Sequence, residues 1–220
     1  MSNRFLVPGT FAVLLLCATP SFAAPVDDWG INLKAGSLGA GVELSKSLGD
    51  NFSVNLSFNA YNVKNTDNIN GIDYDINFDL ESVGLLANYH PSGGVFRFTG
   101  GLMYDNNELK MLGKPTAGTT YTINGTNYTA TQVGALDGKL TFNKAAPYFG
   151  IGWGNRPGEK WGFSADLGVL YQGSPDVSLT ASGSVPGLAA DLEEERKKAE
   201  RDLSHYRWYP VLSLGVYFRF

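Results

Sequence analysis

The sequence predicts an all-β fold, a closed antiparallel β-barrel that crosses a membrane, and three observations support this prediction. The last fifteen residues, 206–220, alternate large apolar residues with smaller or polar ones over the length that a tilted strand needs to cross a bilayer. No stretch after residue 23 contains the roughly 18 consecutive apolar residues that a spanning helix requires. The mean hydropathy of −0.12 is near zero, which is typical of strands with one apolar and one polar face.

The first element is a predicted secretory signal at residues 1–23. Arg4 supplies a positive charge, and residues 11–18 form an apolar run that is too short to anchor the chain in a membrane. Ser21 and Ala23 are the small residues expected before a cleavage site. We expect cleavage after Ala23, with cleavage one residue later as the alternative.

The remaining residues, 24–220, are predicted to form one barrel domain. The single cysteine of the chain, Cys17, lies in the predicted signal, so the exported domain would contain no disulfide and would depend on backbone pairing. Removing Arg4 leaves 16 of the 17 basic residues against 21 acidic residues, a formal charge of −5. This balance argues against a nucleic acid as a partner.

Eight strands are predicted along this domain from the alternation of apolar and polar residues. They cover residues 29–35, 38–46, 52–60, 74–89, 96–104, 147–153, 161–171 and 208–220. Within the fourth strand the apolar residues change from even positions up to Leu80 to odd positions from Val83. We attribute this change to a β-bulge near Ser82.

The number of strands depends on residues 36–39, where the apolar positions change from odd to even. A tight turn there gives eight strands. One long bulged strand would instead give an odd number, which single-chain bacterial barrels avoid. A ten-stranded barrel that adds a hairpin from residues 121–133 is the main alternative to eight.

The connections between these strands differ in length, and the difference predicts their sides of the membrane. Residues 47–51, 90–94 and 155–160 form short connections with the Gly, Pro and Asp of tight turns, which barrels of this kind place in the periplasm. The long connections, 110–136 and 173–205, are then extracellular. Because the last strand ends on the side of the short turns, both termini are expected to be periplasmic.

Two segments of the long connections predict structure of their own. Asn124-Gly125, between arms rich in Thr and Tyr, predicts a β-hairpin. In residues 188–206, Leu188 and Leu192 begin an apolar repeat at helical spacing, with acidic residues early and basic residues later. This pattern predicts a short amphipathic helix in the last extracellular loop, which would cover the barrel mouth, rest on the membrane interface, contact a partner, or remain a solvated loop helix.

Charged residues occur at the positions that should face the lumen. They are Lys34, Glu43, Asp75, Asp79, Glu81, Arg97, Asp166 and Arg219. Because the interior of an eight-stranded barrel is only wide enough for side chains to fill it, these charges should pair, with Arg97 and Arg219 as the cations. We predict a lumen charge network that plugs the barrel and fixes its register; a gated ion path is the alternative.

Aromatic residues occur near the predicted strand ends, where they suit the two membrane interfaces and contacts with outer-membrane lipids and lipopolysaccharide. This predicted girdle comprises Trp29, Tyr104, Trp153, Trp161, Tyr171 and Trp208. The chain also ends on an aromatic strand, with Tyr217, Phe218 and Phe220 in place. That ending resembles the terminal strand of Gram-negative outer-membrane barrels, where the final Phe is part of the signal recognised by the barrel assembly machinery.

Few residues suit catalysis or metal binding. His90 precedes Pro91 in a predicted turn, and His205 follows Ser204 near the last strand. A Ser, His and carboxylate set there would resemble the outer-membrane lipid A deacylases, but adjacent strand residues point to opposite faces and the spacing fixes no Glu. Two histidines and no exported cysteine argue against a transition-metal site. We therefore expect no enzyme activity and no cofactor.

Four short phrases resemble the small eight-stranded outer-membrane β-barrel proteins of Gram-negative bacteria. They are SLGAGV at 37–42, GIGWGN at 150–155, QGSP at 172–175 and WYP at 208–210. The resemblance implies an outer-membrane barrel and transfers no catalytic residue. The expected function is a non-enzymatic barrel with a largely plugged lumen and a surface, envelope or adhesive role. The alternatives are a narrow channel for small solutes or hydrophobic molecules, as in OmpW-like barrels, and a lipid A-modifying enzyme.

Overall fold

The computed structural model describes residues 29–69, 72–116 and 118–220, so the predicted signal at 1–23 lies outside the described residues. Within these ranges, neither helix has both the length and the apolar character needed to cross a membrane. The strands are β1 (Trp29–Gly36), β2 (Gly39–Ser47), β3 (Phe52–Ile69), β4 (Ile72–Tyr89), β5 (Phe96–Asp105), β6 (Glu108–Pro115), β7 (Thr120–Ile123), β8 (Thr126–Thr129), β9 (Leu136–Thr141), β10 (Ala145–Trp153), β11 (Trp161–Tyr171), β12 (Asp176–Ala181) and β13 (Trp208–Arg219). The helices are α1 (Ala130–Val133) and α2 (Leu188–Leu203), with a single 3-10 turn at Pro91–Gly93.

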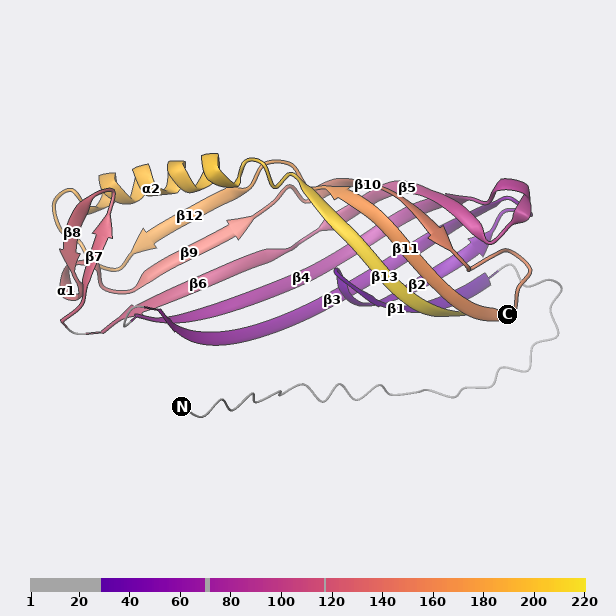
Figure 1. Cartoon of the computed structure of the whole chain (residues 1–220), viewed down its shortest axis with the longest axis horizontal. Coiled ribbons are helices and arrows are strands. Elements are labelled where there is room, and N and C mark those ends of the chain that lie inside the picture. The colour runs from indigo at the N-terminus through magenta and orange to yellow at the C-terminus, as the bar shows by residue number, and fades with distance from the viewer. Residues whose placement is uncertain (1–28, 70–71, 117) are drawn as a thin grey trace.

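Eight of these strands close into an antiparallel barrel, which confirms the predicted fold class (Figure 1). They follow the order β1, β2, β3, β4, β5, β10, β11 and β13, and β13 pairs back onto β1 with Gly30 opposite Arg219. The tight turn predicted at 36–39 is present, because Gly36 pairs directly with Gly39. The ten-stranded alternative is wrong, since the hairpin of β7 and β8 forms a separate sheet.

The two faces of the barrel wall have opposite chemistry. Large apolar side chains point outward and remain exposed, up to 73% for Phe163 and 65% for Leu214. The inward positions hold small or polar residues, which are buried, such as Asn32 and Ser57. An outward apolar belt of this extent is stable only against hydrocarbon. Hydrocarbon offers no hydrogen bonds to the backbone groups of an open strand edge, and closure of the barrel pairs these groups with a neighbouring strand.

Two belts of aromatic side chains border this apolar surface. Trp29, Trp153 and Trp161 lie outward at the end of the barrel where β1 begins and β13 ends. At the other end Tyr171 stacks beside its cross-strand neighbour Trp208, with ring centroids 4.8 Å apart. Trp161 and Tyr171 lie at opposite ends of β11, roughly 33 Å apart along the strand. A tilt of about 40° reduces this distance to about 25 Å, the height of the apolar band of a membrane barrel.

The strands on one side continue far beyond the barrel and form a second region, which we call the head (Figure 1). It is a five-stranded sheet in the order β3, β4, β6, β9 and β12, built from residues 61–69 of β3, residues 72–81 of β4 and the three shorter strands. β6 continues β5 in one unbroken register against β4, since Ser82 pairs with Asp105 and Asp79 with Glu108. The sequence analysis treated most of this sheet as loops, and that part of the prediction was wrong.

The bulge predicted near Ser82 is also absent. β3 and β4 keep one register from Phe52 opposite Tyr89 through Asn59 opposite Ser82. The apolar residues change positions because the surroundings change. In the barrel they face outward toward hydrocarbon, whereas in the head the outside is water and they occupy the face continuous with the lumen, which we call the inner face.

A roof covers the far end of the inner face. Helix α2 forms where the sequence predicts one and packs Leu188 and Leu192 against Tyr121 and Tyr128 of the hairpin and against Val133 of α1. Partly buried residues of β9 and β12 complete this second core, namely Leu136, Leu179 and Ala181. The hairpin is also tied to α2 by hydrogen bonds, which gives the head an ordered tip.

Candidate functional site

The centre of the lumen contains a buried ion-pair network. Arg97 of β5 forms an ion pair with Asp166 of β11, and their side chains are 2% and 8% exposed. Lys34 of β1 lies 2.6 Å from the Glu43 carboxylate and 3.8 Å from that of Asp166. These four side chains come from opposite walls of the barrel, so the network crosses the lumen.

A glycine in β10 makes the central ion pair possible. Gly152 lies between Arg97 and Asp166 in the sheet and pairs with both. A Cβ atom at Gly152 would lie 2.6 Å from Asp166 Oδ1 and 2.8 Å from Arg97 Cζ. The missing side chain therefore leaves the gap through which Arg97 reaches across one strand to its carboxylate partner.

A second polar group closes the lumen near the chain termini. The Arg219 guanidinium donates to Ser47 and, at 3.0 Å, to the backbone and side-chain oxygens of Asn155. Glu43 joins this group to the ion-pair network, because Oε1 accepts hydrogen bonds from Asn55 at 2.8 Å and from Asn155 at 3.5 Å. The two groups therefore form one connected plug, from the centre of the lumen to the barrel end at which β13 finishes.

An apolar cluster closes the lumen at the end facing the head, which we call the barrel mouth. Its buried members are Leu38, Leu86, Met103, Ala146, Tyr148, Leu170 and Val211, with Tyr209 packed against them. The Tyr148 ring lies over Gly150 and Gly168, where any side chain would collide with it. Leu38 comes from the turn between β1 and β2, so this short turn contributes directly to the seal.

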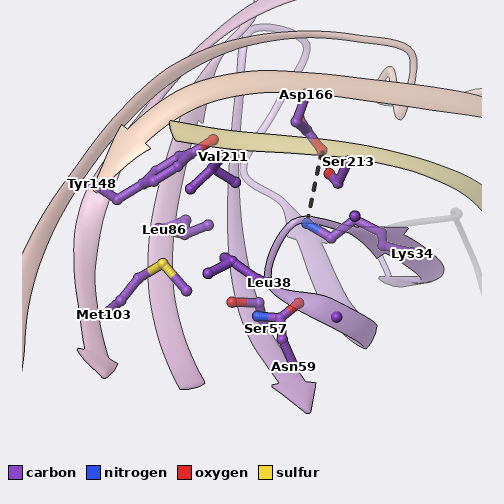
Figure 2. Close-up of a pocket in the computed structure, with 12 residues that line it drawn as sticks. Lys34, Leu38, Ser57, Asn59, Leu86, Met103, Tyr148, Asp166, Val211 and Ser213 are labelled. Carbon is purple, nitrogen blue, oxygen red and sulfur yellow. Dashed lines mark hydrogen bonds and ion pairs between the residues drawn. The ribbon is translucent and has the colours of Figure 1, made fainter. Parts of the chain in front are cut away.

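A small cavity remains between the ionic plug and the apolar cluster (Figure 2). Lys34 reaches toward Asp166 and Ser213 on one side, while Leu86, Met103 and Val211 line the other. The cavity has about 30 Å³, enough for roughly two water molecules. It is a small pocket between the two seals, much smaller than the aqueous channel of a large barrel.

Three predicted lumen residues lie elsewhere. Asp75, Asp79 and Glu81 occupy the outer face of the head, because this part of β4 lies outside the apolar belt of the barrel. Asp75 pairs with Lys114 at 2.8 Å, and Asp79 accepts a hydrogen bond from Asn77 at 3.1 Å. Their assignment to the lumen was wrong for the same reason as the predicted bulge.

Neutral side chains that were not predicted also belong to the plug. Asn32 of β1 donates to Ser164 of β11 at 3.0 Å over the intervening strand β13, and Asn88 donates to Ser53 at 3.1 Å. Asn55 and Asn155 hold Glu43, as described above. Their inward positions in the alternating pattern were a usable signal, but a search restricted to charged residues excluded them.

The two histidines lie apart from this network's ion pairs. The His90 Nδ1 atom lies 3.1 Å from the Gly94 carbonyl oxygen in the turn after β4, and burial keeps the pKa of His90 below its ordinary value. The Ser204 hydroxyl donates to the Arg201 carbonyl at 2.6 Å at the end of α2. Ser204 therefore closes the C-terminal end of α2.

Comparisons with known proteins agree with this architecture. No family model and no curated protein sequence matches the chain. Several solved structures match the chain, among them two crystal structures. Acinetobacter baumannii CarO2 has 24% identity and a TM-score of 0.60 over 90% of this chain and 100% of its own. Acinetobacter baumannii CarO has 25% identity and a TM-score of 0.59 over 89% of this chain and 98% of its own. The chain has the fold of the small outer-membrane β-barrels. This outer-membrane barrel differs from a simple pore in its two lumen seals and in the head that continues one side of its wall.

Proposed function

We propose that this protein is a non-conducting outer-membrane barrel that presents the head at the cell surface, in a surface, envelope or adhesive role. The observation that supports it most is the doubly sealed lumen, with the ion-pair network around Arg97 and Asp166 below the apolar cluster at the mouth. A path for hydrated ions would have to break both seals. The buried and paired charges of this network would serve to fix the register of the strands.

The proposed orientation places the head outside the cell and both termini in the periplasm. The barrel end that holds the termini has only short turns, at 48–51, 90–95 and 154–160. The opposite end carries the whole head. Short periplasmic turns and long extracellular segments are the rule for barrels of this type. Residues 1–23 would direct export, and they would be absent from the mature protein.

The proposed partners of the barrel wall are outer-membrane lipids and lipopolysaccharide. The aromatic belts lie at the depths expected for the two interfaces, and cations accompany them. Lys46 Nζ is 5.1 Å from the Trp29 ring centroid, and Lys144 Nζ is 5.7 Å from that of Tyr104. Tyr217, Phe218 and Phe220 end the chain on the last strand, as an assembly signal for the barrel assembly machinery would require.

Planar-bilayer conductance of the purified protein tests the closed lumen. We expect a flat current trace at moderate voltage for the wild-type protein. Steady single-channel steps that disappear or change size in Arg97→Ala, and remain in the head variant Lys110→Ala, would contradict the proposal and favour the narrow channel. A change in the mass profile of lipid A on deletion of the protein would instead favour the lipid-modifying enzyme.

A further inference from the structure

The inner face of the head contains a row of apolar side chains that crosses its full width. One row of side chains runs over all five strands, each residue directly opposite the next: Val63, Phe78, Leu109, Leu140 and Val177. The row nearer the barrel begins with Tyr61 opposite Leu80. The row farther out contains Ile76 and Met111. An apolar surface of this width resembles the core-facing side of a sheet.

The side of this face formed by β3, β4 and Met111 of β6 is not covered by the roof. The roof of α2 and the hairpin contacts residues of β9 and β12 at the far end. On β3, β4 and β6, Tyr61, Val63, Phe78 and Met111 remain 38% to 48% exposed. A contiguous apolar patch that faces water is unfavourable unless something binds there. We call this exposed patch the trough.

A molecule in the trough could move toward the lumen or sideways past the barrel wall, and the route into the lumen is closed. Toward the lumen, the apolar cluster and the ion-pair network close the barrel. Toward the side, the barrel wall is short, because β1 and β2 meet at the turn of residues 36–39 while β3 and β4 continue along the long axis into the head (Figure 1).

Small residues line a groove at this short edge of the wall, beside the turn between β1 and β2. Its lining is Ala35, Gly36, Ser37, Gly39, Ala40, Ala60, Tyr61 and Leu80. Tyr61 and Leu80 belong to the trough, whereas Ala35, Ala40 and Ala60 point outward at the upper edge of the lipid-facing belt. The groove therefore joins the trough to the surface that contacts the membrane, without a charged residue in its lining.

We propose that the trough binds the hydrocarbon tail of a single-chain amphiphile taken up from the water outside the cell, and that the groove passes the tail to the outer leaflet. The inference rests on the closed lumen and the outward head of the proposed function. The continuity of the trough with the lipid-facing belt supports this occupant, because an alkyl chain stays in apolar contact along the whole route. The polar headgroup would remain in water above the trough.

Photocrosslinking of the full-length protein in lipid nanodiscs tests this inference. The probe is dodecanoic acid that carries a diazirine on its tail, and crosslinked peptides are mapped by mass spectrometry. We expect crosslinks within residues 61–63, 78–80 and 109–111, in addition to those on the lipid-facing belt. Labelling of the belt alone would mean that the probe only dissolves in the bilayer, which would overturn the proposal.

Matched variants separate a binding site from general apolar contact. Phe78→Glu places a charge in the trough and should lower head labelling about tenfold, the effect of losing burial of roughly two methylene groups. Asn77→Glu places the same charge on the outer face of the same strand and should leave labelling unchanged. Equal labelling of the two variants would refute the trough as the site.

A second pair of variants tests the groove. Ala60→Phe fills it and should remove crosslinks to residues 35–40, whereas Ala87→Phe adds the same ring elsewhere on the lipid-facing side of the barrel and should not. Nanodiscs with a diazirine-bearing phospholipid and no free fatty acid distinguish the source. Head labelling there would identify an outer-leaflet lipid as the occupant and would overturn uptake from water. Conductance tests the closed lumen and crosslinking tests the trough, so the two proposals can fail independently of each other.

Discussion

Removal of the Asp166 carboxylate should destabilise the barrel strongly, because the charge of Arg97 would remain buried without its partner. The two side chains are 8% and 2% exposed, and Asp166 also accepts a hydrogen bond from Ser213 at 3.1 Å. Breaking a buried ion pair by removing one partner costs about 3–5 kcal/mol. We therefore expect Asp166→Ala to lower the free energy of unfolding by about 3–5 kcal/mol.

Urea unfolding in lipid vesicles, followed by the fluorescence of the four tryptophans, measures this change. The double variant Arg97→Leu with Asp166→Leu should be closer to wild type than either single variant, because it leaves neither charge stranded. Asp75→Ala is the control, since it removes an exposed carboxylate that pairs with Lys114 on the outer face of the head. If Asp166→Ala unfolds like Asp75→Ala, or if the double variant shows the sum of the single effects, the reasoning about the plug is refuted.

Three further predictions concern the plug, the outer face and the roof. Gly152→Ala should destabilise the barrel by about 1–3 kcal/mol in the same urea assay, because the added methyl group intrudes on the central ion pair. Hydrogen bonds from Lys110 and a second lysine hold the pKa of Glu108 below its usual range, so the stabilisation that Glu108 gives the head is present at neutral pH and lost as the pH falls through this lowered pKa. Hydrogen exchange of β6 should therefore rise in acid for the wild-type protein and depend less on pH in Glu108→Gln. The Tyr128 hydroxyl donates to Asp191 at 2.6 Å, so Asp191→Ala should loosen the hairpin from α2 and increase limited proteolysis between residues 116 and 130, whereas unchanged cleavage would show that the apolar contacts suffice.

The elements that the sequence predicted correctly are those defined by local patterns. The eight barrel strands, the turn at 36–39, the hairpin at Asn124-Gly125 and helix α2 each depend on neighbouring residues, and each is present. The head was missed because its pairing is between distant segments: β6, β9 and β12 are short and come from different connections. The fourth strand was predicted to begin at residue 74, but nothing in the sequence of β6 indicates that it pairs with that part of β4.

The placement of site residues failed at one identifiable step. Lys34, Glu43, Arg97 and Asp166 were predicted from the alternation inside the membrane, where inward means polar, and the structure brings them together. Asp79 and two neighbouring acids were assigned by the same rule beyond the membrane, where it reverses. A strand that leaves hydrocarbon for water changes its apolar positions without changing its register, and from sequence this looks the same as a bulge.

The central claim is that β4 passes from the membrane into water without a bulge. Spin labels on single cysteines along β4 test it most directly, since Cys17 is the sole cysteine of the chain and lies within the predicted signal. Positions 77, 79, 81, 83, 85 and 87 share one face. We expect labels at 83, 85 and 87 to collide mainly with oxygen dissolved in lipid, and labels at 77 and 79 to collide mainly with a water-soluble nickel reagent. Lipid-type accessibility at even positions such as 76 and 78 would show that the apolar face still points into the membrane there, and would contradict the account.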